Sequence, residues 1–137
     1  MQYNKSMQTR KETISVKIGN ISIGSQHPIR VQSMTNTNTS DVEATCKQIM
    51  ELYDAGSEMV RITVNDVESA KSVSEIKSIL LQKNYNVPLI GDFHFNGHIL
   101  LSKYPETASA LDKFRINPGN IGGKEKFDAN FEKIINL

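Results

Sequence analysis

Charged and amide side chains lie inside or directly after four apolar, strand-like runs of the sequence. A guanidinium beside a core residue is poorly tolerated unless an anionic group meets it. Two such arginines, with the backbone amides of a Gly pair before a predicted helix, predict a site for a small di- or polyphosphorylated metabolite, because both kinds of donor favour phosphate. The candidate binding residues are Gln32, Ser33, Arg61, Asp92, His94, Arg115, Asn117 and Asn120, with the amides of Gly122 and Gly123.

Asp92 and His94 are two residues apart and would share one face of a strand. Histidine can move a proton near neutral pH or donate to a phosphate, and an aspartate can bind a hydroxyl or orient a neighbour. The alternatives are structural: Arg61 would form a salt bridge with Asp92, His94 would be a hydrogen-bonded core residue, and the Gly pair would only turn the chain. The residues alone leave both interpretations open.

The one cysteine and three histidines form no metal-binding pattern. His98 follows His94 by four residues, but a strand end and a loop separate them, so we expect no shared metal and no metal site in this chain. Cys46 lies on the apolar stripe of a predicted helix, which favours a small buried hydrophobe over a reactive nucleophile. Arg30 is nearer the start of its strand and is expected below the ligand.

The charge balance excludes some classes of partner. Sixteen Lys plus Arg residues and fifteen Asp plus Glu residues give a net charge of +1 without a basic block, which indicates neither nucleic acid nor an anionic membrane as partner. No apolar run reaches the roughly 20 residues of a membrane helix, and the N-terminus lacks the apolar segment of a secretory signal. We therefore expect a cytoplasmic protein in which residues 1–12 are a flexible N-terminus.

The order of elements alternates strand and helix. Residues 14–24 alternate apolar and polar around Gly19 and Asn20, which predicts a β-hairpin. Ser40 and Glu43 form a predicted capping box for the next helix, and Gly56 is its predicted stop. Further strands are predicted at 29–34, 58–64, 87–95 and 113–117, and helices at 41–55, 65–84, from 97 with an interruption at Pro105, and 124–137. This order indicates parallel strands joined by helices.

The polar content of the strands favours a barrel over a doubly wound sheet, whose central strands are apolar on both faces. Near their C-terminal ends the polar residues alternate with Val31, Ile62, Phe93 and Ile116, so one face is apolar and the other ends in hydrogen-bonding groups. We predict an α/β fold of the (β/α)8 TIM-barrel type, which binds ligands at the C-terminal mouth of its strands. With a hairpin and about four βα units, residues 13–137 would be the N-terminal half, either part of a longer protein or a half that assembles between chains.

The segments VQSMTNTNTSDVEAT, VRITV, VPLIGDFHF and RINPGNIG resemble, in this order and at similar spacing, the N-terminal half of the bacterial 4-hydroxy-3-methylbut-2-enyl diphosphate synthases of the non-mevalonate isoprenoid pathway. The resemblance covers the chain from about Ile14 onward. It implies a TIM-barrel domain that binds the cyclic diphosphate of 2-C-methyl-D-erythritol, which these enzymes open reductively. On matching positions it assigns the substrate pocket to Arg61, Asp92, His94, Arg115 and Asn117, with the two arginines meeting the diphosphate.

The resemblance also implies a 4Fe-4S cluster in a separate C-terminal domain, flavodoxin or ferredoxin as electron donor, and a homodimer of the full-length protein. The cluster ligands and the later barrel strands are not found in this sequence, so we expect the chain alone to be inactive. Two alternatives remain: a non-catalytic truncated remnant or anion-binding fragment, and a barrel enzyme similar to the dihydropteroate synthases, which would need pterin contacts. The usual Ala-Asp-Ile-His-Phe motif is changed at Gly91 and Phe93, which leaves Asp92 and His94 in place.

Overall fold

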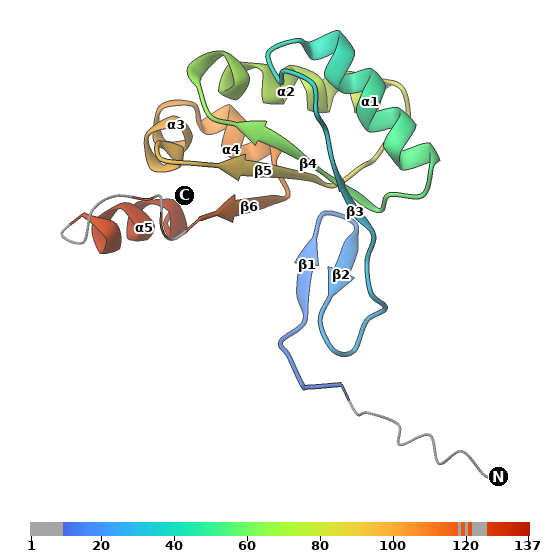
Figure 1. Ribbon diagram of the computed structural model, residues 1–137, viewed down its shortest axis with the longest axis horizontal. Helices are drawn as coiled ribbons and strands as arrows, with labels where there is room; N and C mark the ends of the chain where they lie inside the picture. Colours follow the sequence, from blue (N-terminus) through green and yellow to red (C-terminus); the bar gives the residue numbers. More distant parts are fainter. Residues whose placement is uncertain (1–9, 118, 120, 122–125) are drawn as a thin grey trace.

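The computed structural model describes residues 10–117, 119, 121 and 126–137 (Figure 1). A short hairpin is followed by strands that alternate with helices, as the sequence predicts. The elements in chain order are β1 (Val16–Ile18), β2 (Ile21–Ile23), β3 (Gln32–Met34), α1 (Val42–Asp54), β4 (Met59–Val64), α2 (Val67–Gln82), β5 (Leu89–Phe93), α3 (Gly97–Lys103), α4 (Pro105–Ala110), β6 (Lys113–Ile116) and α5 (Phe127–Ile135). Among these helices, none has the length and apolarity needed to cross a membrane.

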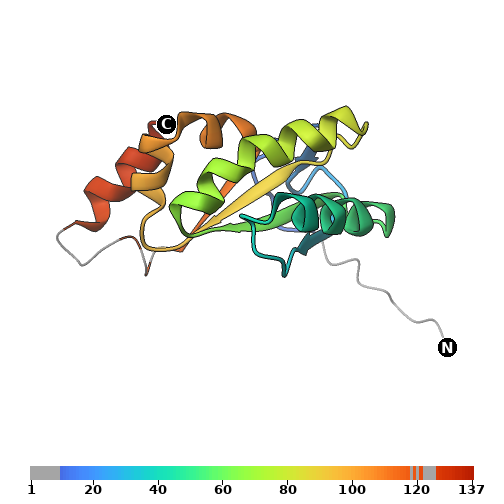
Figure 2. The same cartoon turned by 90° about the horizontal axis from the view of Figure 1, so that it is seen from above.

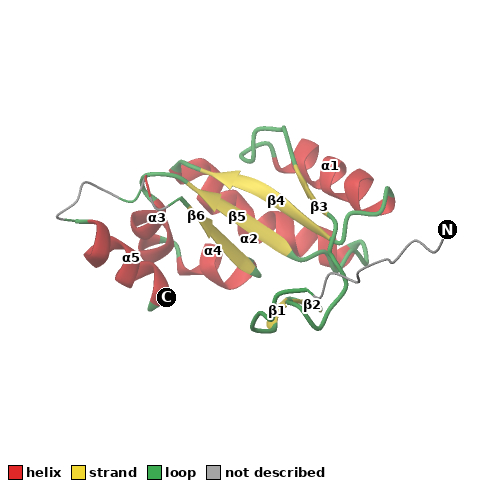
Figure 3. Cartoon of the chain, turned by 60° about the horizontal axis from the view of Figure 1, so that its bottom comes forward, coloured by secondary structure: helices red, strands yellow, loops and turns green. Residues whose placement is uncertain are grey.

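The main sheet is a four-stranded parallel sheet in the order β3-β4-β5-β6. Seen from above, α1 and α2 lie over the strands (Figure 2), and with the bottom turned forward the strands lie in front of the helices (Figure 3). The helices therefore cover one face of the sheet. In the described part of the chain β3 and β6 are edge strands and the sheet does not close. The predicted α/β fold with parallel strands joined by helices is confirmed.

The hydrophobic core lies between the sheet and the helices. Ile62 of β4 and Phe93 of β5 are fully buried there, against Ile49 of α1 and Ile76 of α2. Alternate strand residues contribute to this core, because successive side chains of a strand point to opposite faces. The apolar face predicted from the alternation of the sequence is thus the helix-covered face.

The ends of α1 show one wrong prediction and one correct one. The helix cap is Asp41, whose Oδ1 accepts a hydrogen bond from the Ala44 amide at 3.1 Å, and not Ser40, whose hydroxyl donates to Asn38 Oδ1. A carboxylate one residue later can satisfy the same free amides, which removes the need for a capping box. Gly56 ends the helix as predicted, with φ of 108° and its amide donating to the Tyr53 carbonyl.

The other helices and strands lie where the sequence predicts them, but the strands are shorter than predicted. Pro105 begins α4 directly after α3, so it restarts the helix as expected. The strand predicted at 29–34 is regular only at Gln32–Met34, and the one predicted at 87–95 ends at Phe93. Of the predicted flexible residues 1–12, residues 1–9 lie outside the described part of the chain, and Arg10 donates to the His27 carbonyl at 2.7 Å.

The hairpin packs against the N-terminal end of the sheet on the face that carries no helices. Ile18 of the hairpin contacts the buried side chains of Met59 and Ile90. An ion pair fixes this contact: Arg30 Nη1 lies 2.7 Å from Glu58 Oε1, and Arg30 Nε donates to the Ser22 carbonyl of β2. The other Glu58 oxygen accepts from the Val31 amide at 2.9 Å, so one carboxylate joins the hairpin, the start of β3 and the start of β4.

The Glu58 carboxylate should make stability depend on pH. The Val31 amide, followed by the Arg30 guanidinium, lowers the pKa of Glu58 below its ordinary value of 4.5. A lowered folded-state pKa contributes stability above the unfolded-state pKa and loses it as the pH falls through the folded-state pKa. In urea unfolding from pH 7 down to pH 3, we expect wild type to be more stable than Glu58→Gln at pH 7 and the difference to shrink below about pH 5.

Glu51→Gln is the matched control, because the Glu51 carboxylate lies 4.0 Å from Lys47 on an exposed helix surface. Such pairs contribute little, so this variant should follow wild type across the pH range. A Glu58→Gln difference that does not change with pH would contradict the assigned role of the carboxylate.

Candidate functional site

The face of the sheet that carries no helices brings Arg61, Asp92 and Arg115 together. Thr63 of β4 pairs in register with Asp92 of β5, and Asp92 pairs with Arg115 of β6. Arg61 precedes Thr63 by two residues and therefore points to the same face. Three side chains from three parallel strands thus meet toward the C-terminal ends of those strands, which is where ligands bind in barrels.

Asp92 is the centre of this cluster. Its side chain is 5% exposed, and its Oδ1 accepts a hydrogen bond from Arg115 Nη1 at 3.1 Å. Its Oδ2 lies 3.6 Å from Arg61 Nε and 3.8 Å from His94 Nε2. A buried carboxylate is costly unless it is paired, and here it is shared by two guanidinium groups. The salt bridge between Arg61 and Asp92 that the sequence left as an alternative is therefore present, but Arg115 joins it.

The cluster retains positive charge. Two guanidinium groups face one carboxylate, and Asp92 is the only acidic residue among the described strand positions on this face. The Arg61 and Arg115 side chains are 29% and 40% exposed, so both can reach a ligand from solvent. Guanidinium groups with free donors suit the oxygens of phosphate or carboxylate. The arrangement can therefore bind a small anion.

Arg61 has a further contact that sequence reasoning missed. Its Nε and Nη2 lie 3.2 Å and 3.1 Å from Sδ of Met34, which pairs with Arg61 in register on the neighbouring strand β3. The strand period offered a signal, since Met34 is two residues after Gln32 and must share its face. A thioether is only a weak hydrogen-bond acceptor, so a methionine is not an obvious candidate for a contact with arginine.

The other candidate residues are placed differently. Gln32 is exposed on the same face as Met34, whereas Ser33 points to the opposite face and its hydroxyl contacts that of Ser57. His94 follows β5 and is partly exposed beside Asp92. Asn117 follows β6 and its Oδ1 accepts from the Gly119 amide at 3.1 Å. Asn120, Gly122 and Gly123 lie outside the described residues.

A cavity of about 220 Å³ lies next to the cluster, at the C-terminal ends of β3 and β4. Thr63, which is the register neighbour of Asp92, is one of its walls. The lining consists of hydroxyl and amide side chains from Thr37, Asn38, Thr39, Thr63, Asn65 and Ser69. A cavity lined by hydrogen-bonding side chains, one of which is the register neighbour of Asp92, suits a ligand that carries hydroxyl groups as well as an anion.

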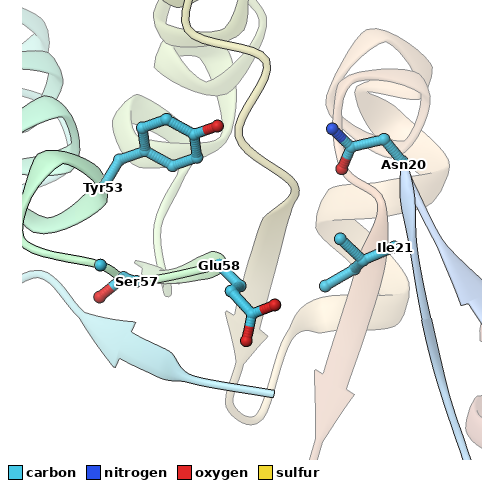
Figure 4. A pocket seen from close by; sticks show the side chains of 6 residues that line it. Asn20, Ile21, Tyr53, Ser57 and Glu58 are labelled. Atoms are coloured by element: carbon cyan, nitrogen blue, oxygen red, sulfur yellow. The ribbon is translucent and has the colours of Figure 1, made fainter. Parts of the chain in front are cut away.

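Another cavity, of about 420 Å³, lies at the opposite end of the strands between the hairpin turn and the end of α1 (Figure 4). It is lined by Asn20, Ile21, Tyr53, Gly56, Ser57 and Glu58. Glu58 is already paired with Arg30, which places Arg30 below the cluster as expected. None of the candidate site residues that the structure describes lines this cavity.

Cys46 and His98 lie apart from the cluster. Cys46 is 3% exposed within the core, and burial raises the pKa of its thiol, which confirms a small buried hydrophobe. His98 is on α3, where burial lowers its pKa. In the part of the chain that the structure describes, no three His, Cys, Asp or Glu side chains come close enough to hold a metal ion.

Comparison with known protein families gives one match that covers most of the chain. Residues 13–136 match the family model described as the GcpE TIM-barrel domain. The match includes every strand of the described sheet and all the residues of the arginine cluster. It agrees with the open parallel sheet, whose strands alternate with helices as in such a barrel.

Asp92→Asn should show how far the cluster depends on its carboxylate. The substitution leaves two guanidinium groups without their shared counter-charge, so we expect the free energy of unfolding to fall by about 1–3 kcal/mol. This loss is smaller than for a fully buried pair, because both arginines are partly exposed. Urea unfolding followed by circular dichroism measures it, and the loss should shrink at high salt, which screens the repulsion between the arginines.

Asp54→Asn is the matched control, because the Asp54 carboxylate accepts from the Tyr85 hydroxyl at the surface. Its effect should stay within about 0.5 kcal/mol at any salt concentration. Equal stability of Asp92→Asn and wild type at low salt would show that the arginines do not need this carboxylate.

Proposed function

Because this chain belongs to the GcpE family, which converts a methylerythritol cyclic diphosphate to 4-hydroxy-3-methylbut-2-enyl diphosphate in isoprenoid biosynthesis, we propose that it supplies the diphosphate-binding part of that reaction. The observation that carries the proposal is the pair of partly exposed guanidinium groups on either side of Asp92. Arg61 and Arg115 bind the diphosphate, and Asp92 orients both.

The geometry supports this division of roles. Among the described residues Arg115 donates only through Nη1, to Asp92, so its other N–H groups can donate to a phosphate oxygen. His94, at 41% exposure beside the same carboxylate, is in position to donate to the ligand as well. Asn117 directly follows β6 near Arg115 and would add a donor or acceptor at the rim, whereas Gln32 begins β3 and pairs in register with Met59, below Arg61 on the same face. The hydroxyl-lined cavity beside Thr63 has the chemistry to receive the hydroxyl groups of the ligand.

The residues of this chain do not fit the family's 4Fe-4S cluster. Such a cluster needs several thiolate ligands, whereas the chain has one cysteine and its side chain is buried in the core. We therefore assign substrate binding to these residues and no redox step. Electron transfer from flavodoxin or ferredoxin, the homodimer of the whole protein and its cytoplasmic location are parts of the proposal that rest on the family resemblance.

If the two arginines of the cluster bind the diphosphate, replacing either one should weaken ligand binding. Arg61→Lys and Arg115→Lys keep the positive charge but lose the two-donor fork, so each should weaken binding of the cyclic diphosphate about tenfold. Isothermal titration calorimetry of the full 137-residue chain, with inorganic pyrophosphate as a second ligand, measures the loss.

Arg30→Lys is the matched control, because Arg30 pairs with Glu58 at the other end of the strands. Arg30→Lys should change the affinity for the cyclic diphosphate less than about twofold, because substitutions away from a site usually have effects of this small size. If wild type binds neither ligand, the chain is a folded remnant without a diphosphate site. If it binds a pterin diphosphate instead, it resembles the dihydropteroate synthases in function.

The absence of cluster ligands from the sequence predicts that the chain performs no turnover by itself. With a chemically reduced electron donor and the cyclic diphosphate, we expect product formation no faster than without protein. Chromatographic detection of 4-hydroxy-3-methylbut-2-enyl diphosphate is the measurement. Product formed in proportion to the concentration of this chain would contradict the assignment of binding alone.

A further inference from the structure

The thioether of Met34 occupies the part of Arg61 that would bind an anion. The Nε and Nη2 groups of Arg61 form one edge of the guanidinium, and both lie within 3.2 Å of Met34 Sδ. Two parallel N–H donors on one edge are what pairs with two oxygens of a carboxylate or phosphate. In the structure this edge therefore faces a neutral sulfur atom.

The competing acceptor for the same edge is Asp92. Its Oδ2 lies 3.6 Å from Arg61 Nε, which is beyond a normal hydrogen bond, although the two groups carry opposite charges. Met34 is on the edge strand β3 in register with Arg61, so its side chain lies on the side of Arg61 away from β5. The guanidinium is thus in contact with the sulfur and short of a hydrogen bond with the carboxylate.

We propose that Met34 is a positioning residue that keeps the Nε–Nη2 edge of Arg61 available for an anionic oxygen of the ligand. The inference rests on the proposed function, because that function supplies the anion. A thioether is a weak acceptor and is exchanged easily, whereas a phosphate oxygen forms a charge-assisted hydrogen bond about twice as strong as a neutral one. Binding then replaces the thioether contact and does not have to break a hydrogen bond between Arg61 and Asp92, whose Oδ2 lies 3.6 Å from Nε.

This role differs from simple packing in its response to substitution. Leucine has nearly the volume of methionine but no acceptor, so Arg61 would close on Asp92 and the ligand would have to separate them. Glutamine offers a stronger neutral acceptor, which the ligand would have to displace. Both Met34→Leu and Met34→Gln should therefore weaken pyrophosphate binding, by about threefold to tenfold. Met34 is 40% exposed, so neither substitution threatens the core.

The experiment follows the Arg61 Nε–H resonance by ¹⁵N NMR and the pyrophosphate affinity by calorimetry, on the full chain. The resonance should shift in Met34→Leu without ligand, because the hydrogen-bond partner changes. Selenomethionine, which keeps a soft acceptor of the same shape, should hold the affinity within about twofold of wild type. Met50→Leu on α1 is the matched control, because Met50 packs on the helix-covered core and should change neither signal.

Each outcome decides one of the two proposals. An unchanged Arg61 Nε–H resonance in Met34→Leu, or an affinity equal to wild type in both Met34 variants, overturns the role of Met34. A wild type that binds neither pyrophosphate nor the cyclic diphosphate overturns the proposed function, even where the resonance responds to Met34→Leu. A shifted resonance with weaker binding in both variants supports the inference.

Discussion

The register of three parallel strands is the constraint on which the site depends. Because β4, β5 and β6 pair in parallel, Thr63, Asp92 and Arg115 lie side by side, and Arg61 reaches the same face two residues earlier. The opposite face carries Ile62 and Phe93 into the helix-covered core. A shift of one residue in any strand would exchange these two sets of side chains. The burial of Ile62 and Phe93 in the core favours one register, and that register also sets the positions of the site residues.

Asp92 would have two opposing effects on the proposed binding of an anion. It gives the two arginines a common partner, without which their repulsion would separate them, and it also competes with any ligand for the same donors. The structure balances these effects by distance: Arg115 is hydrogen-bonded to Asp92, whereas Arg61 is held slightly away by Met34. The Nε–Nη2 edge of Arg61 therefore stays beyond hydrogen-bonding distance of Asp92, although its Nε is within ion-pair distance of Oδ2.

The two ends of the sheet use the same kind of ion pair for different purposes. At the N-terminal end, Arg30 and Glu58 are satisfied by each other and by backbone groups of the hairpin and β3, so the pair serves the fold. In the cluster toward the C-terminal end, two arginines face one carboxylate, and the net positive charge suits the proposed anionic ligand. The same division is general in TIM barrels, where residues at the N-terminal ends of the strands stabilise the fold and residues at the C-terminal ends bind the ligand.

The sequence by itself determined the elements and their types, because these depend on local periodicity and on single residues such as Gly56 and Pro105. It also indicated the family, which the match over residues 13–136 confirms, and it predicted the residues of the proposed anion site, through motifs that lie within or directly after single strands. Tertiary structure alone decided that Asp92 is shared between two arginines, that Ser33 faces away and that Met34 contacts Arg61. These are distances between strands far apart in the chain, and they are set by register and packing, which no local pattern records.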